Sequence, residues 1–338
     1  MGDVAMTVPV LRALVLQNPT VKITFISRPF FKPLIEKIEN VTFFEFDEKK
    51  RHKGFLGLIR LYFDLKKLNI DFFADLHNVL RSKIVRSLLQ LNGTTVAFTN
   101  KGRADKKALT RSTNKIFVQL PTVFERHQKV FQQLGFNLDL SKPIFPNKSI
   151  LSEDILKLFP DNEFKNDLNL IGIAPFAQYE SKIYPLDLMQ KVIDNLALND
   201  KNLIFLFGGG LSEIGRLNGL SKDSKNIICV AGTTKFEKEL ELISNLNLML
   251  SMDSGNAHIA AIFGIKVLTL WGSTHPFSGF SPFNQPDENA LVSDRSFYPK
   301  LPTSIYGNKK VEGYQDAMRT ITIDNILSAV QNNLKNDI

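Results

Sequence analysis

The 338-residue sequence has a single cysteine, no long apolar run and no targeting segment that its composition reveals. The cysteine, Cys229, lies inside the apolar run 227–230, which excludes a disulfide framework and a cluster of thiolate metal ligands. No apolar run is long enough to span a bilayer, and the first residues lack the basic and then apolar pattern of a signal peptide. These absences predict a globular protein of the reducing cytoplasm.

Motifs for several cofactors are also missing. The glycines at 208–210 follow an apolar run, but they lack the full spacing of a dinucleotide-binding motif, and no acid stands where one would bind a nicotinamide ribose. The P-loop pattern is absent, and no group of His, Asp and Glu has the spacing of metal ligands. We therefore expect no metal, no bound cofactor and no dehydrogenase activity.

Acidic residues are scarce in the first part of the chain. Residues 1–150 hold 25 Lys and Arg against 12 Asp and Glu, whereas the remainder holds 17 against 22. Such a basic surface serves solubility, or it meets an anionic partner such as a phosphorylated lipid, a membrane surface or nucleic acid. Because no aromatic-interleaved basic motif or known binding module accompanies the charge, we expect no nucleic acid.

What the chain does contain is a regular alternation of apolar β-rich runs and helical patterns. The predicted strands are 22–27, 41–46, 72–76, 94–98, 170–174, 203–207, 227–230, 246–250 and 267–270. The predicted helices are 4–16, 55–68, 80–91, 185–198, 213–220, 235–244 and 256–263. This alternation predicts an α/β fold with parallel sheets and helices on both faces.

The chain is long enough for two domains. Segment 140–169 is rich in Lys, Pro, Asn and Asp, which predicts a linker between a domain at 1–150 and a domain at 165–320. An apolar stripe at helical spacing near the end predicts a C-terminal helix, within 321–338, that packs back across the junction.

The most informative segment is 252–261, which follows an apolar run typical of a buried strand. Asp253 ends that strand, and Gly255 lets a ligand approach the backbone. Ser254 or Asn256 caps the helix that follows, and the first amides of such a helix suit a phosphate or a sugar.

Single residues in this segment also have purely structural explanations. Asp253 can be only a helix cap, and His258 only a packed histidine. The turn 272–276, however, follows the next predicted strand. Its Ser, Thr and His would therefore meet Asp253 and His258 at one edge of one sheet, which favours a ligand site.

Three weaker motifs also have both a structural and a functional explanation. Asp3 precedes an apolar helix whose dipole keeps a carboxylate ionised, so it is either an N-cap or a general base. Lys182, between a strand end and a helix start, is either a surface lysine or a cation that stabilises a departing diphosphate. Gly208 and Gly209, followed by Glu213, either permit a tight turn or hold a nucleotide whose ribose bonds to the glutamate.

Taken together, these motifs resemble glycosyltransferase family nine, the lipopolysaccharide heptosyltransferases, over nearly the whole chain. The resemblance is carried, in order, by Gly2-Asp3-Val4 with 7–14, Asp75-Leu76-His77-Asn78 with Arg81-Ser82, Lys182 with Tyr184-Pro185, Gly208-Gly209 with Glu213, Asp253-Ser254-Gly255-Asn256-Ala257-His258 and Gly272-Ser273-Thr274-His275-Pro276.

The resemblance implies a GT-B architecture, in which two doubly wound Rossmann-like domains face each other across a cleft. It implies inverting, metal-independent transfer of a heptose or related sugar from a nucleotide-diphosphate donor, ADP-heptose above all. The acceptor would be the lipopolysaccharide core or a related anionic glycolipid. The enzyme would be cytoplasmic, and peripheral on the inner leaflet of the inner membrane.

The resemblance also implies roles for single residues. Asp3 would be the catalytic base, Lys182 the phosphate-binding and catalytic cation, and Arg81 an acceptor ligand. The donor would be bound by Lys182, Gly208, Gly209, Glu213, Asp253, Ser254, Gly255, Asn256 and His258.

Two departures and two alternatives stay open. Family members carry a strand before the Gly-Asp pair, so we expect that Met1 is an internal methionine of a longer natural chain. Tyr184 stands where many relatives have tryptophan, which would alter the donor pocket. A sugar-nucleotide epimerase on the same scaffold, or a non-catalytic saccharide-binding protein, would share these features.

Overall fold

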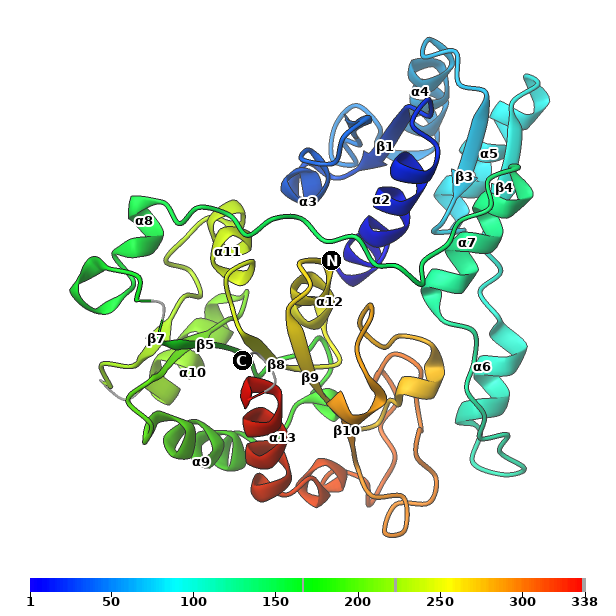
Figure 1. Ribbon diagram of the computed structural model, residues 1–338. Helices are drawn as coiled ribbons and strands as arrows, with labels where there is room; N and C mark the ends of the chain where they lie inside the picture. The colour runs from blue at the N-terminus through cyan, green and yellow to red at the C-terminus, as the bar shows by residue number, and fades with distance from the viewer. Residues whose placement is uncertain (166, 222–223, 336–338) are drawn as a thin grey trace. The chain divides into compact units, whose positions relative to one another are not determined.

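The computed structural model describes residues 1–165, 167–221 and 224–335, in which strands and helices alternate along the chain (Figure 1). These residues divide into two compact units. Unit 1 holds Met1 and residues 3–103 and 121–144, and unit 2 holds Gly2, residues 104–120 and the residues from 145 onwards. The predicted α/β class is confirmed. The domain limits of 1–150 and 165–320 stay a prediction, and residues 104–120 cluster with unit 2.

Unit 2 is built on a six-stranded parallel sheet. The strands are β5 (Asn169–Ala174), β6 (Asn202–Leu206), β7 (Ile227–Cys229), β8 (Leu248–Met252), β9 (Lys266–Trp271) and β10 (Ala290–Val292). They lie in the order β10-β9-β8-β5-β6-β7. The chain therefore adds β6 and β7 on one side of β5 and then crosses over to add β8, β9 and β10 on the other side. Because every pairing is parallel, all the strands end at one edge of the sheet.

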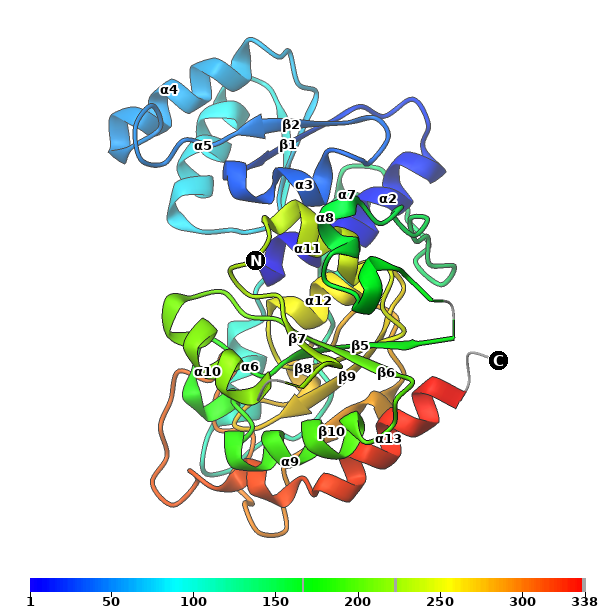
Figure 2. The ribbon, with the colours of Figure 1, turned by 90° about the vertical axis from the view of Figure 1, so that its left-hand side faces the viewer.

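Helices cover both faces of this sheet. Those of unit 2 are α6 (Arg103–Thr110, whose first residue belongs to unit 1), α8 (Glu153–Leu156), α9 (Leu186–Ala197), α10 (Leu211–Ser221), α11 (Phe236–Ile243), α12 (Gly255–Ile262) and α13 (Ile323–Lys335). Figure 2 shows α9 and α13 on one side of the sheet and α11 and α12 on the other. Strands covered in this way are mostly apolar, and every residue of β6 and β8 is buried, including Asn202 and Ser251.

The C-terminal helix α13 packs within unit 2. Its Ile326 and Val330 are fully buried in the same core cluster as Val192 and Ile193 of α9. The helix also contacts β8 and β9. That it reaches unit 1 as well stays a prediction, and the last three residues of the predicted segment lie outside the described residues.

Unit 1 contains two separate pairs of parallel strands. They are β1 (Ile23–Ser27) with β2 (Val41–Glu45), and β3 (Phe72–Asp75) with β4 (Thr95–Phe98). Its helices are α1 (Gly2–Ala5, whose first residue clusters with unit 2), α2 (Val8–Gln17), α3 (Lys32–Ile35), α4 (Gly54–Lys66), α5 (Leu80–Leu91) and α7 (Val123–Gln133). Leucines of α4 pack against α5, and α7 packs against β4. The expected loss of a first strand stays a prediction.

The helix predicted at 4–16 is divided in two. α1 ends at Ala5, and α2 begins at Val8. Pro9 lies in the first turn of α2, and because proline has no N–H it cannot donate to the carbonyl of Ala5. The turn is closed instead by Thr7, whose hydroxyl donates to the carbonyl oxygen of Asp3 at 2.9 Å.

Five of the α-helices and strands were not predicted from the sequence: α3, α6, α7, α8 and β10. β10 has only three residues, too few to show a pattern. α7 did carry a signal, because Thr122 and Glu125 form a capping box. The strand predicted at 246–250 begins and ends two residues later, as β8. Within the described ranges, no helix combines the length and the apolar character needed to cross a bilayer.

We expect the hydroxyl of Tyr184 to stabilise unit 2. Tyr184 is fully buried and donates to the carbonyl oxygen of Ile321, just before α13, at 2.8 Å. Tyr184→Phe leaves that carbonyl without its partner and should lower the free energy of unfolding by about 1–2 kcal/mol. Denaturant unfolding measures the change, and Tyr306→Phe, at a tyrosine that is 52% exposed, should change it by less than about 0.5 kcal/mol. Equal effects would contradict the assignment.

Candidate functional site

The sheet of unit 2 changes direction between β5 and β8. Strands are added on one side of β5 up to β7, and the chain then crosses to β8 on the other side. In open parallel sheets the loops at such a point diverge and leave room for a ligand beyond the strand ends. The segment 175–182 follows β5 and the segment 253–254 follows β8, so both lie at this point.

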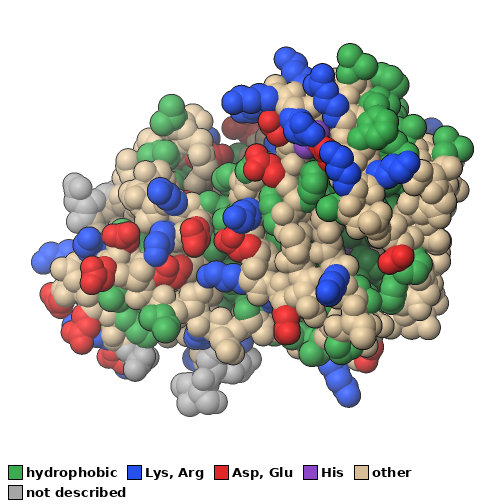
Figure 3. All heavy atoms as spheres, turned by 90° about the horizontal axis from the view of Figure 1, so that it is seen from above, with side chains coloured by type: hydrophobic (Ala, Val, Ile, Leu, Met, Phe, Trp, Pro, Cys, Tyr) green, Lys and Arg blue, Asp and Glu red, His purple; other side chains and the backbone are tan. Residues whose placement is uncertain are grey.

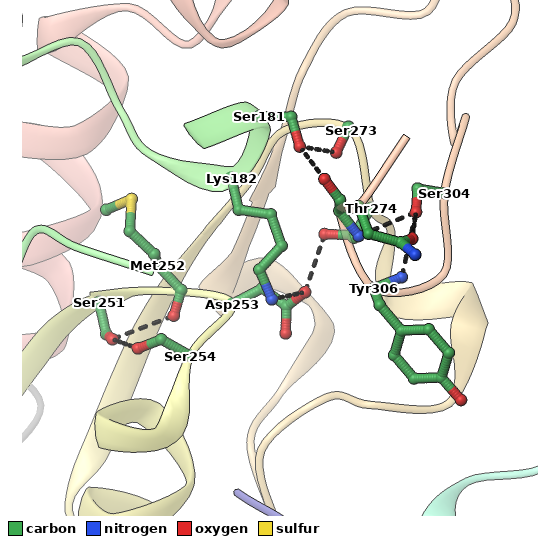
Figure 4. Close-up of polar contacts among 12 residues, drawn as sticks. Ser181, Lys182, Ser251, Met252, Asp253, Ser254, Ser273, Thr274, Ser304 and Tyr306 are labelled. Carbon is green, nitrogen blue, oxygen red and sulfur yellow. Dashed lines mark hydrogen bonds and ion pairs between the residues drawn. The ribbon is translucent and has the colours of Figure 1, made fainter. Parts of the chain in front are cut away.

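A buried ion pair joins these two segments (Figure 4). Lys182, the last residue of the short helix η3 (Glu180–Lys182), donates from Nζ to Oδ2 of Asp253 at 3.0 Å. The side chains are only 11% and 9% exposed. Gly307, with a φ of +85°, lies so close that a Cβ there would come within 2.6 Å of the Lys182 side chain. The absence of a side chain at Gly307 therefore leaves space for the lysine.

The loop after β9 completes this cluster. Thr274 donates from Oγ1 to the same carboxylate oxygen of Asp253 at 2.9 Å. Ser273 donates to the hydroxyl of Ser181 at 2.7 Å, and that hydroxyl donates to the carbonyl of Gly307 at 2.7 Å. We call Ser181, Lys182, Asp253, Ser273 and Thr274 the Lys182 cluster. It holds an ammonium group at a fixed position, with N–H groups beyond the one given to Asp253.

Helix α12 begins directly beside this cluster. Ser254 is its N-cap, but the hydroxyl lies 3.1 Å from that of Ser251 instead of capping the helix amides. Gly255 and Asn256 form the first turn, and His258 is buried on the same helix. The first amides of α12 therefore point out of the helix end, where its dipole favours an anion.

The glycine loop after β6 lies at the same sheet edge. The carboxylate of Glu213, in the first turn of α10, accepts from the amide of Gly209 at 2.7 Å. A Cβ at Gly208 would come within 2.7 Å of Leu217 Cδ1 and 3.2 Å of Glu213 Oε2, so a side chain at this turn would displace one of these groups. In the described structure, Glu213 thus closes its own loop.

In unit 1, Asp3 lies near a histidine. Asp3 Oδ2 is 3.9 Å from His77 Nε2, and the two side chains are 74% and 60% exposed. The turn that carries His77 is held by Asp75, whose Oδ1 accepts from the amides of His77 and Asn78 at 3.2 and 2.6 Å. Arg86 in turn binds the other Asp75 oxygen at 3.0 Å. The backbone of the turn that carries His77 is therefore held in place by Asp75, the buried last residue of β3.

Arg81, the predicted acceptor ligand, is already engaged. It donates to Glu48 at 2.8 Å, and its side chain is 55% exposed. The ion pair holds the pKa of Glu48 below its ordinary value. Because the pair lies in solvent, it is worth little, and an anionic ligand can compete with Glu48 for the guanidinium.

The structure brings some predicted residues together and adds others. Lys182, Asp253 and the start of α12 meet at the switch point, whereas Gly208, Gly209 and Glu213 form a separate contact beyond β5. No sequence pattern indicated the hydroxyl contact of Ser181 or the contact between Asp3 and His77, and Thr274 was predicted only as part of its motif. Among the described residues, no three His, Cys, Asp or Glu side chains are grouped closely enough to hold a metal ion.

Residues 104–120 pack beside the loop that carries Thr274. Phe117 contacts the rings of His275 and Phe277, and the Arg295 guanidinium lies 3.5 Å from the centre of the Phe117 ring. His275 is buried, and its Nδ1 accepts from the amide of Phe277 at 3.1 Å. Burial, together with the charges of Arg295 and Lys115, lowers the pKa of His275 to about 4.

We expect His275 to make unit 2 less stable in mild acid. Its imidazole stays neutral when folded but takes up a proton near its ordinary pKa of about 6.5 when unfolded. The contribution of His275 to the free energy of unfolding is therefore fully present above about pH 6.5, and it is lost as the pH falls toward about 4. One such group lowers the free energy of unfolding by about 2 kcal/mol between about pH 7.5 and about pH 5.

The replacement His275→Asn keeps an acceptor for the Phe277 amide but does not titrate. Denaturant unfolding at the two pH values should therefore show a smaller loss of stability in acid for the variant than for the natural chain. The same pH dependence in both proteins would show that another group is responsible.

Comparison with known proteins identifies the family. The family model described as glycosyltransferase family 9 (heptosyltransferase) matches residues 58–307, about three quarters of the chain. The lipopolysaccharide core heptosyltransferase OpsX of Haemophilus influenzae is 23% identical over 301 residues, which cover 87% of this chain and 82% of the relative. Lipopolysaccharide heptosyltransferase 3 of Escherichia coli is 27% identical over 172 residues, which are 49% of this chain and 47% of that protein.

Solved structures share the fold. A family 9 glycosyltransferase from Veillonella parvula superposes with a TM-score of 0.76 at 18% identity, covering 99% of this chain and 95% of that one. An E. coli heptosyltransferase crystallised with ADP gives 0.66 at 15% identity, covering 98% and 97%. The predicted GT-B class is thereby confirmed. The chain belongs to glycosyltransferase family 9, and it is a glycosyltransferase of the lipopolysaccharide heptosyltransferase type.

Proposed function

We propose that this enzyme transfers a heptose or related sugar from ADP-heptose, or a similar nucleotide-sugar, to a lipopolysaccharide core or related glycolipid, with inversion and without a metal ion. The observation that carries the proposal is the Lys182 cluster at the switch point of the unit 2 sheet. The E. coli relative crystallised with ADP supports the choice of nucleotide.

The donor diphosphate would lie between Lys182 and the start of α12. As the bond to the sugar breaks, negative charge grows on the leaving diphosphate, and an ammonium group that is already in position stabilises it without reorganising. Asp253 and Thr274 restrict where the ammonium can go. The amides of Gly255 and Asn256 add the positive end of the helix dipole. Asp253 and His258 would in addition bind sugar hydroxyls.

The glycine loop would take the nucleoside part of the donor. Gly208 and Gly209 leave backbone exposed at the end of β6, and Glu213 is the only acid in the first turn of the following helix. Binding would exchange its contact with the Gly209 amide for hydrogen bonds to a ribose. This exchange is inexpensive because the contact lies in solvent.

The acceptor would be activated by Asp3. Its carboxylate is exposed, close to His77 and in the first turn of α1, so it can accept a proton from a sugar hydroxyl. Arg81 would bind an anionic group of the acceptor. Exclusion of water from the donor during transfer would limit its hydrolysis. We place the reaction in the cytoplasm, where nucleotide-sugars are available.

Donor binding and the role of Lys182 can be tested together. In a thermal-shift screen of ADP-heptose beside UDP-, GDP- and CMP-sugars, ADP-heptose should give the largest stabilisation. Lys182→Ala removes a charge-assisted contact to the diphosphate and should weaken ADP binding about 10- to 100-fold by calorimetry. Lys201→Ala, at an exposed lysine of the same unit, is the matched control and should bind ADP normally.

Normal ADP binding by a folded Lys182→Ala variant would rule out Lys182 as a residue of the donor site. Because that variant leaves Asp253 buried without its cation, its melting temperature in the absence of ligand must be measured as well. A larger thermal shift with another nucleotide-sugar would replace ADP-heptose as the donor. Conversion of the donor without any acceptor would instead indicate an epimerase.

We expect Asp3→Asn to suppress transfer but not donor binding. The amide cannot accept the acceptor proton, so kcat should fall about 10²- to 10⁴-fold, whereas ADP affinity should change less than about twofold. Product formation from ADP-heptose and a lipid-free core saccharide measures kcat. Asp71→Asn, at another exposed acid of unit 1, should leave kcat unchanged. Turnover near the natural rate in Asp3→Asn would rule out Asp3 as the base.

A further inference from the structure

Helix α4 is apolar on both of its faces. Its inner face carries Leu58, Leu61 and Leu65, which form a buried cluster with Val85 and Leu89 of α5. These contacts account for the attachment of α4 to unit 1. The apolar residues on the opposite face therefore need a separate explanation.

The outer face exposes three large apolar side chains. Phe55 is 64% exposed, Leu56 is 70% exposed and Phe63 is 54% exposed. At about 100° per residue, these three fall within an arc of roughly 100° on the helix. Single exposed apolar residues are common on protein surfaces, but three bulky ones on one helix face form a patch.

Cations share this face. Arg60, Lys66 and Lys67 are exposed and lie on the same half of the helix, and Lys53 precedes its first turn. Figure 3, which views the molecule from the side where α4 lies in Figure 1, shows lysine and arginine side chains beside hydrophobic ones. We call Lys53, Phe55, Leu56, Arg60, Phe63, Lys66 and Lys67 the α4 surface.

The acid of this helix does not offset the positive charge. Asp64 is bound by Arg51 at 2.6 Å and lies 3.3 Å from His52 Nε2. The hydrogen bond from Arg51 lowers the pKa of Asp64 to about 2. Residues 49–67 contain seven Lys and Arg and this one acid, so the α4 surface remains strongly positive.

From this arrangement we propose that the α4 surface docks on an anionic lipid membrane, with Phe55, Leu56 and Phe63 inserted among the acyl chains and the cations at the phosphate level. Amphipathic helices that lie in a membrane interface combine these two features. The long stems of Lys66 and Lys67 allow their charges to reach the headgroups while the rings lie deeper.

The chemistry of the surface argues against other occupants. Nucleic acid would match the cations but would offer nothing to the three apolar side chains. A second copy of the chain would bring like charges together across a two-fold axis, which disfavours a symmetric dimer through this face. An anionic membrane matches both parts at once.

The proposal takes its biological setting from the proposed function, because the acceptor of a lipopolysaccharide heptosyltransferase is held in a membrane by its lipid. Binding to vesicles, however, is measured without donor or acceptor. A failure of transfer and a failure of membrane docking are therefore separate results.

The experiment is vesicle co-sedimentation of the whole protein. Vesicles of phosphatidylethanolamine with phosphatidylglycerol should bind it, vesicles of phosphatidylcholine alone should not, and added salt should weaken binding. The charge variant Arg60→Gln/Lys66→Gln/Lys67→Gln should lower the partition constant about fivefold for each cation removed. The apolar variant Phe55→Ser/Leu56→Ser/Phe63→Ser should lower it at least about tenfold.

Matched controls come from unit 2. Leu198→Ser/Leu211→Ser replaces leucines that are 82% and 91% exposed, and Lys157→Gln/Lys201→Gln removes exposed cations. Both controls should bind as the natural chain does. Transfer to a lipid-free acceptor should be normal in every α4-surface variant, which shows that each of them is folded and active.

Three outcomes would overturn the proposal. They are vesicle binding that is as strong for the two α4-surface variants as for the natural chain, equal binding to neutral and anionic vesicles, and no binding to either. Sedimentation analysis of the protein without vesicles tests whether a second copy of the chain binds the α4 surface. A dimer that the apolar variant abolishes would make this surface a self-association face instead.

Discussion

The buried ion pair between Lys182 and Asp253 is the constraint on which the candidate site depends. A buried charge without a partner is strongly destabilising, so each of these residues requires the other. They come from loops that follow β5 and β8, and these loops meet only because β8 lies next to β5 in the sheet. The strand order thus makes the pair possible, and the pair in turn fixes both loops. Thr274 extends the same constraint to the loop after β9.

The polar residues of unit 1 are organised differently. Asp3 and His77 are exposed, and their contact contributes little to stability. What is rigid is the support: Asp75 is buried, binds Arg86 and accepts the amides of the turn that carries His77. Arg86 in turn lies 3.9 Å from the centre of the Phe98 ring. The base that we propose, Asp3, must be accessible to the acceptor hydroxyl, whereas the buried Asp75 holds the neighbouring turn in place.

The structure shows where some of the excess cations of the first part of the chain lie. Residues 49–67, in and just before α4, hold seven of the 25 Lys and Arg of residues 1–150 and a single acid, which is neutralised by an ion pair with Arg51. In unit 2, by contrast, Lys182 has an acid as its partner within the fold. The two kinds of cation therefore differ in availability, since a cation that is paired and buried is confined to one site, whereas exposed cations beside apolar side chains remain available to a large anionic surface.

The sequence alone determined the α/β class, nearly all the strands of both units and the placement of Asp253, Lys182 and Glu213 at strand ends, because alternation and cap signals are local. Only the tertiary structure decided which of these residues meet. Lys182 and Asp253 are 71 residues apart, and no local pattern encodes that they pair. The same holds for His77 beside Asp3 and for residues 104–120, which follow strands of unit 1 but cluster with unit 2. Periodicity tells which face of an element is buried, but the partner of that face depends on strand order, which is set by the packing of the whole sheet.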